Sequence, residues 1–185
     1  IYEYLVKKDL NIIEYVNSKK DIITETFFEK AIKNNRKDIL EYLHQKECKP
    51  PKIPCAIAVV YGNLECLKYL VEFKYDTKYI KLNSIKYNQL ECLKYIHSIM
   101  PLNDEMCKFS AQHGSLDCLI YLKDNNFLID RNVYLTAIKN NKLDIIKYLD
   151  SINCETPNDC CAQASTNIDL LKYFHSNNHP INSNT

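Results

Sequence analysis

Glycine is nearly absent from this chain of 185 residues, which contains only Gly62 and Gly114. Phosphate-binding loops need glycine so that the backbone can approach the phosphate, and the shortage therefore excludes the P-loop and the dinucleotide fingerprint. No apolar run approaches the ~20 residues that a membrane-spanning helix requires, and no signal peptide opens the chain. We therefore expect no nucleotide cofactor and no membrane partner.

An excess of charge of either sign is also missing. The 24 Lys and Arg residues nearly balance the 23 Asp and Glu residues, which gives a formal net charge of +1. Nucleic acids and anionic membranes attract strongly basic proteins, so the near-neutral balance predicts that this chain binds neither. The chain begins with Ile1 rather than Met, and we expect it to be a fragment of a longer protein.

What the sequence has instead is an internal repeat. Its motif is an acidic residue followed by three mostly apolar or basic positions and a tyrosine, as in Glu65-Cys66-Leu67-Lys68-Tyr69. The tyrosines recur at intervals of 25 to 27 residues and are Tyr15, Tyr42, Tyr69, Tyr95, Tyr121, Tyr148 and Tyr173. A fixed period of this length is typical of a solenoid of stacked units.

Each unit is predicted to be a pair of helices. In the second helix Leu64, Leu67, Leu70 and Val71 form an apolar stripe at helical spacing. Asn63 and Ser115 are the residue types that cap such a helix. The acidic residue is expected to pair with the lysine three positions later, in the units of Lys68, Lys94, Lys147 and Lys172.

The first helix of each unit carries a column of small residues that allows close packing: Ala31, Ala58, Ser84, Ser110, Ala137 and Ala162. Its expected N-caps include Thr24, Thr77, Asn103, Asp130 and, in the last unit, Thr156 followed by Pro157. The turn to the second helix carries residues that tolerate a positive φ, namely Asn35, Gly62, Asn88, Gly114 and Asn141. One pair cannot bury its apolar face alone, so stacking must complete the core.

This pattern resembles the ankyrin repeat, whose G-H-L-E-V-V-K-L-L segment is similar to Gly62–Leu70 and Gly114–Leu122. The unit is shorter than the usual ~33 residues, and the T-P-L-H tetrapeptide is reduced to Thr156-Pro157. The short period is similar to that of ankyrin variants in giant DNA viruses and protists. The resemblance implies an all-α, ankyrin-like solenoid of stacked antiparallel helix pairs, with about six to seven repeats and hairpins reduced to loops. A single array would then span residues 1–185.

Cysteine and histidine also follow the repeat. Cys66, Cys92 and Cys118 share one column, and His44, His97 and His175 share another, two residues after the tyrosine. Repeated cysteine is typical of small core side chains, and free thiols indicate a reducing compartment. Metal ligation at Cys160-Cys161 with His175 and His179, and a Cys118–His113 nucleophile pair, are the alternatives; the first lacks zinc-ligand spacing and the second places its cysteine in a core column. We predict no metal, no cofactor and no enzymatic activity.

The candidate partner-binding residues depart from the consensus just before the turn: Lys33, Tyr61, Lys86, Tyr87, His113 and Lys139. Packing does not require aromatic residues there, whereas binding hot spots are rich in them. The resemblance implies a protein-interaction scaffold that binds an unknown protein through its concave face and loops. The alternative is an adaptor that recruits a target to host machinery such as a ubiquitin ligase. We expect a cytoplasmic monomer, located in the host cytoplasm if the protein is viral.

Overall fold

The computed structural model describes residues 25–164 and 167–179, and this part of the chain consists of α-helices with no strand. The prediction of an all-α fold is confirmed. The unit around Tyr15 and the expected N-cap Thr24 lie outside the described residues.

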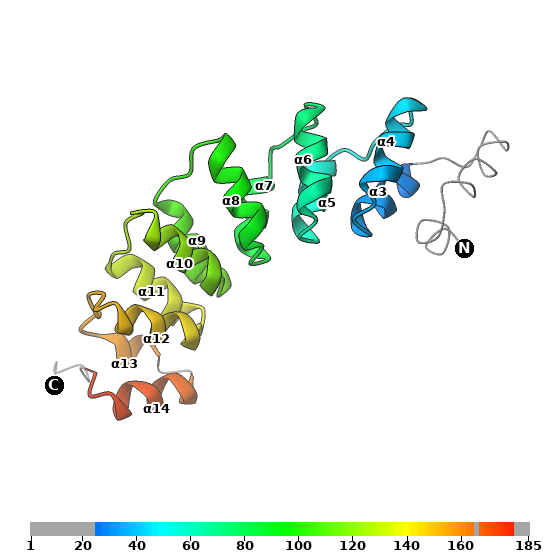
Figure 1. The fold of residues 1–185 in the computed structure, drawn as a ribbon. Helices are drawn as coiled ribbons and strands as arrows, with labels where there is room; N and C mark the ends of the chain where they lie inside the picture. The colour runs from blue at the N-terminus through cyan, green and yellow to red at the C-terminus, as the bar shows by residue number, and fades with distance from the viewer. Residues whose placement is uncertain (1–24, 165–166, 180–185) are drawn as a thin grey trace.

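The helices alternate between two rows. The first helices of the units are α3 (Glu25–Lys33), α5 (Pro54–Val60), α7 (Ile80–Lys86), α9 (Glu105–His113), α11 (Arg131–Lys139) and α13 (Cys160–Gln163). The second helices are α4 (Lys37–Gln45), α6 (Leu64–Glu72), α8 (Leu90–Ile99), α10 (Leu116–Asp124), α12 (Leu143–Ser151) and α14 (Ile168–Ser176). The pairs are stacked one after another along a curved row (Figure 1).

The two rows differ in how closely their members pack. Successive first helices, such as α5 and α7 or α9 and α11, contact one another more extensively than successive second helices such as α6 and α8. Small side chains permit this approach, because Ala31, Ala58, Ser84, Ser110 and Ala137 are all fully buried. A stack bends toward its more closely packed row, so the first helices line the inner side of the curve.

The core forms two clusters that meet at the pair α7–α8. Ile80, Cys92 and Ile96 of this pair pack with the units before it. Ile85 and Leu93 pack with the units after it. The hydrophobic core is thus continuous along the stack, and each unit depends on its neighbours for burial.

The turns within the units adopt the predicted left-handed backbone. Asn35, Asn88 and Asn141 have φ values of 53°, 51° and 55°, and Gly62 and Gly114 have 70° and 78°. A second set at the ends of the second helices was not predicted: Glu47, Lys74, Asn126, Asn153 and Asn178. Glu and Lys do not indicate a positive φ from sequence. The helix α8 is an exception, since Met100 is extended and Pro101 follows it.

The prediction that Asn63 and Ser115 cap the second helices is wrong. Neither side chain accepts a capping hydrogen bond. Asn63 Nδ2 instead donates to the carbonyl oxygen of Ile32 at 2.6 Å, and Ser115 Oγ donates to that of Ile85. Gln89 Nε2 makes the equivalent bond to Val60 at 3.3 Å. These side chains tie three successive units, those of α5, α7 and α9, to the end of the preceding first helix, where carbonyl groups have no helical partner.

Among helices α4 to α14, side-chain caps occur at two positions. The expected N-caps Thr77 and Asn103 are wrong, because α7 and α9 begin later and have no side-chain cap. The predicted N-cap Asp130 accepts hydrogen bonds from the backbone N–H groups of Asn132 and Val133 at 3.0 and 3.1 Å. Asn167 does the same for Asp169 and Leu170 at the start of α14. Of the four expected acid–lysine pairs, Glu65–Lys68 and Glu91–Lys94 are confirmed at 2.9 and 2.7 Å, whereas Lys147 and Lys172 form no ion pair with any described residue.

The last unit departs from the sequence alignment. The expected cap Thr156-Pro157 is wrong, because α13 begins three residues after Pro157 at Cys160. The expected small core residue Ala162 is exposed, and Ala164 is buried in its place. This unit is shorter, with 25 residues from Tyr148 to Tyr173. The buried small residue of its first helix, Ala164, therefore lies nine residues before the tyrosine, whereas Ala137 lies eleven residues before Tyr148.

A partly buried polar cluster joins the last two described units. Asp150 of α12 accepts hydrogen bonds from the Tyr134 hydroxyl at 2.7 Å and from the Tyr173 hydroxyl at 2.8 Å. His179 Nε2 lies 3.2 Å from the same carboxylate. Burial, with the hydrogen bond to Asp150 second, raises the pKa of Tyr134 and raises that of Tyr173 to about 12. Both tyrosines therefore remain protonated donors at neutral pH.

The left-handed turn at Gly114 gives a first testable prediction. A Cβ atom at this position would lie 3.0 Å from Lys142 Cδ, which can move, whereas the φ of 78° cannot change without breaking the turn. We expect Gly114→Ala to lower the free energy of unfolding by about 1 to 2 kcal/mol. Gly114→Asn should cost clearly less, because asparagine occupies the same turn in three other units. Urea denaturation followed by circular dichroism measures both, and equal losses would contradict this explanation.

Candidate functional site

The six predicted binding residues all lie where the first helices end. Lys33, Lys86, Lys139 and His113 are the last residues of α3, α7, α11 and α9. Tyr61 and Tyr87 follow α5 and α7 directly, and their side chains are 50% and 44% exposed. The structure therefore places all six along one edge of the inner row.

Lysine and tyrosine side chains pair along this row. Lys33 Nζ lies 5.5 Å from the centre of the Tyr61 ring in the next unit, and Lys86 Nζ lies 5.4 Å from the Tyr87 ring. A third pair at the other end of α7 was not predicted, with Lys78 Nζ 5.2 Å from the Tyr79 ring. The ring face attracts a cation, so each lysine is held beside a phenol.

Lys33 differs from the other two lysines because it has an acidic partner. Its ammonium group lies 2.5 Å from Glu29 Oε1, and this hydrogen bond raises the pKa of Lys33. Lys78 and Lys86 are exposed and form no ion pair with any described residue. The charges of Lys78 and Lys86 are therefore available to a partner.

His113 and Lys139 continue the row beyond α7. The imidazole of His113 packs against the Phe109 ring with centroids 4.4 Å apart. Burial lowers the pKa of His113, and the nearby Lys86 and Lys142 lower it further, so the ring is neutral at pH 7. Lys139 is exposed. The pKa of Asp159 is lowered by its hydrogen bond with Gln163 and, to a smaller extent, by the charge of Lys139. The lysines that lower the pKa of His113 are Lys86 and Lys142 instead. The structure thus brings Lys86, Tyr87 and His113 together and leaves Lys139 apart.

The helices α5 and α7 also expose apolar side chains that sequence reasoning missed. We define the α5–α7 patch as Ile53, Tyr61, Tyr79, Leu82 and Tyr87, which are 39% to 50% exposed. Ile53 occupies in its unit the position of Tyr79, and Tyr61 occupies that of Tyr87, each 26 residues earlier. Because α5 and α7 pack side by side, these equivalent positions adjoin one another. Comparing equivalent positions between units is the sequence signal that could have found the patch.

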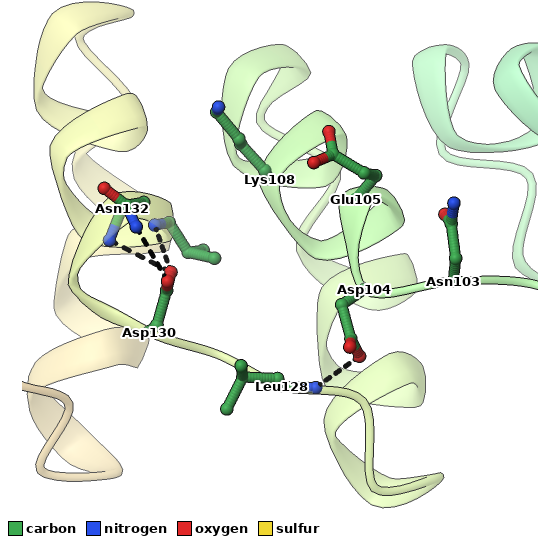
Figure 2. Close-up of a pocket in the computed structure, with 8 residues that line it drawn as sticks. Asn103, Asp104, Glu105, Lys108, Leu128, Asp130 and Asn132 are labelled. Atoms are coloured by element: carbon green, nitrogen blue, oxygen red, sulfur yellow. Dashed lines mark hydrogen bonds between the residues drawn. The ribbon is translucent and has the colours of Figure 1, made fainter.

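A hollow lies on the loop side, between the starts of α9 and α11 (Figure 2). Its volume is about 340 Å³, and it is lined in part by Asp104, Glu105, Leu128 and Asp130. Asp104 accepts a hydrogen bond from the backbone N–H of Leu128 at 2.8 Å, and Asp130 caps α11. Both aspartates thus stabilise the loop that connects the two units. Their carboxylates therefore have a structural role, and the hollow is not a candidate binding site.

The nine cysteines are free thiols, and six of them are buried. Burial raises the pKa of Cys55, Cys66, Cys107 and Cys118 to about 12 and that of Cys92 to about 11. Thiols with such pKa values are weak nucleophiles at neutral pH. Cys118 directs its sulfur to the Ser84 carbonyl oxygen at 3.7 Å, not to His113.

Within residues 25–164 and 167–179, no group of three or more His, Cys, Asp and Glu side chains could hold a metal ion. His97 Nδ1 bonds with the Tyr121 hydroxyl at 2.8 Å, and His179 pairs with Asp150. No helix in the same part of the chain combines the length and apolarity needed to cross a bilayer.

Comparison with known proteins identifies the fold. The crystal structure of the human ASB11 ankyrin repeat domain is similar to this chain with a TM-score of 0.60 and 14% sequence identity. The similarity covers 80% of this chain and 82% of that one. No protein-family model matches the sequence, and a search of curated proteins finds no match. The chain therefore has an ankyrin-repeat-like fold, recognisable in three dimensions.

Proposed function

We propose that this chain is a non-enzymatic protein-interaction scaffold, which binds a partner through the inner row of first helices. The observation that carries the proposal is the α5–α7 patch. In the described part of the chain it holds five of the nine large apolar side chains that are exposed. Contiguous exposed apolar surface is typical of interaction sites, and tyrosine is enriched at binding hot spots.

Two further features are part of the proposal. The free cysteines support a reducing, cytoplasmic location, since disulfides form in oxidising compartments. The same tie to the preceding unit, repeated in the units of α5, α7 and α9, supports a single array, which would act as a monomer. Its short period supports an origin like that of the short ankyrin variants of giant viruses and protists.

The test is to replace Tyr61 and Tyr87 together by alanine. A partner is first identified by crosslinking mass spectrometry of the intact protein in its native cell, and its affinity is then measured by calorimetry. We expect the double variant to bind that partner at least tenfold more weakly, a loss of about 1.4 kcal/mol or more. Both side chains are half exposed, so the melting temperature should change little.

Ile168→Ala is the matched control, because Ile168 is 66% exposed on α14 of the second row. It removes exposed apolar surface away from the proposed site and should leave the affinity unchanged. Full affinity of the Tyr61→Ala, Tyr87→Ala variant would contradict binding through the inner row.

A further inference from the structure

We propose that the partner contributes an acidic segment with apolar side chains, which docks across α5 and α7 with its carboxylates on the lysine–tyrosine pairs. This inference rests on the proposed function and names the chemistry of the partner. It follows from two properties of the same surface, an apolar centre and a rim of unpaired positive charge.

The apolar centre comes from both helices. α5 contains no charged residue and exposes Ile53 and Tyr61 at its two ends. Tyr79 directly precedes α7, and Leu82 and Lys86 lie within it. The three residues are spaced at i, i+3 and i+7 and therefore share one face of the helix. Leu82 is 41% exposed between the two tyrosines of its helix. A partner must supply apolar side chains to cover this surface.

Every charged residue in the two stretches of sequence that form the patch is a lysine. Residues 49–64 and 77–90 contain five lysines and neither aspartate nor glutamate. Lys81 donates to the carbonyl oxygen of Pro101 at 2.6 Å, and Lys33 is neutralised by Glu29. Asp76, which precedes the second stretch, accepts a hydrogen bond from the backbone N–H of Lys78 at 2.8 Å. Lys49, Lys52, Lys78 and Lys86 are exposed and form no ion pair with any described residue, and of these Lys78 and Lys86 are the two that lie beside tyrosine rings of the patch.

The two lysines stand at opposite ends of α7, and each lies beside a tyrosine ring. An ammonium group and a phenol hydroxyl at one place can both donate to a single carboxylate, and such charge-assisted bonds are the strong ones. Tyr79 and Tyr87 are eight residues apart, which corresponds to about 12 Å along a helix. The surface thus suits two carboxylates about 12 Å apart with an apolar side chain between them, which contacts Leu82.

A protein segment fits this surface better than a nucleic acid. The three tyrosine rings of the patch could stack on bases, but the aliphatic side chains of Ile53 and Leu82 in the same patch could not, whereas apolar side chains of a protein segment would cover both kinds of residue. The chain as a whole carries a net charge of only +1, whereas non-specific nucleic-acid binding depends on many lysines and arginines. The lysines beside the patch are sufficient to bind a few carboxylates of a protein segment.

The test uses a library of random 16-residue peptides displayed on phage, selected against the folded chain. We expect the selected peptides to be enriched in Asp and Glu together with Leu, Ile, Phe or Trp. The strongest peptide is then synthesised, and its affinity is measured by fluorescence anisotropy at low and at high salt. Lys78→Glu combined with Lys86→Glu should weaken binding by about tenfold and remove most of its salt dependence.

The matched control is Lys147→Glu combined with Lys172→Glu, which changes the charge equally on exposed positions of α12 and α14. It should leave peptide binding unchanged. Selection of neutral or basic peptides, failure to select any peptide, equal loss in the control, or tighter binding to a 16-base-pair DNA duplex would each overturn the inference. If one of these results is found while Tyr61→Ala with Tyr87→Ala still weakens binding of the cellular partner at least tenfold, the proposed function stands and only the acidic segment is wrong.

Discussion

Leu93→Ala is expected to lower the free energy of unfolding by about 3 kcal/mol, because it opens a cavity in the centre of the stack. Leu93 of α8 is fully buried and belongs to the pair where the two core clusters meet. In a repeat protein each unit is stabilised only by its neighbours. Weakening the central junction should therefore reduce the cooperativity between the two halves as well as the total stability.

Urea denaturation with circular dichroism at 222 nm measures both effects. The midpoint should fall, and the transition should broaden or separate into two steps. Leu171→Ala is the control, since Leu171 occupies the equivalent position in the last described unit and is only partly buried. We expect it to cost about 1 kcal/mol or less and to leave the transition of the other units unchanged. A larger loss for Leu171→Ala than for Leu93→Ala would contradict this account of the core.

Asp150→Ala is expected to destabilise the last two units by about 2 to 3 kcal/mol. The carboxylate accepts the hydrogen bonds of Tyr134 and Tyr173, and the Tyr134 side chain is fully buried. Removing the acceptor leaves the hydroxyl of the buried Tyr134 without its partner. Asp150→Asn keeps one acceptor oxygen and should cost less.

A second substitution separates this explanation from a simple loss of packing. Tyr134→Phe removes the hydroxyl that Asp150→Ala leaves unpaired, so the double variant should be more stable than Asp150→Ala alone by about 1 kcal/mol. Thermal denaturation of the four proteins of this cycle gives the coupling energy. Strictly additive losses would show that the hydrogen bond is not the cause.

The sequence predicted the parts of the fold that depend on one unit at a time. The left-handed residues Asn35, Gly62 and Asn88 were identified because each stands in a turn column of residues that tolerate a positive φ. The second helices were identified from their apolar spacing. The cysteine column of Cys66, Cys92 and Cys118 was interpreted correctly as buried side chains, because burial follows the helical period.

The sequence did not predict features that involve two units together. Asn63 and Ser115 have the chemistry of N-caps, and only the stacking shows that the carbonyl groups of Ile32 and Ile85 lie within their reach. The α5–α7 patch likewise combines residues 53 to 87 across a unit boundary. Glu47 and Lys74 give no local indication of their left-handed backbone, which is imposed by the connection to the next unit.

The tighter spacing of the inner row has a mechanical consequence. Because curvature results from the difference in spacing between the two rows, flattening the arc would require adjacent first helices such as α5 and α7 to move apart. Each junction between units would contribute a small part of the total displacement. The array should therefore bend elastically, like a spring, and the contacts between adjacent first helices should determine its stiffness. A segment bound across α5 and α7 would oppose that separation and hold the spring near its resting curvature.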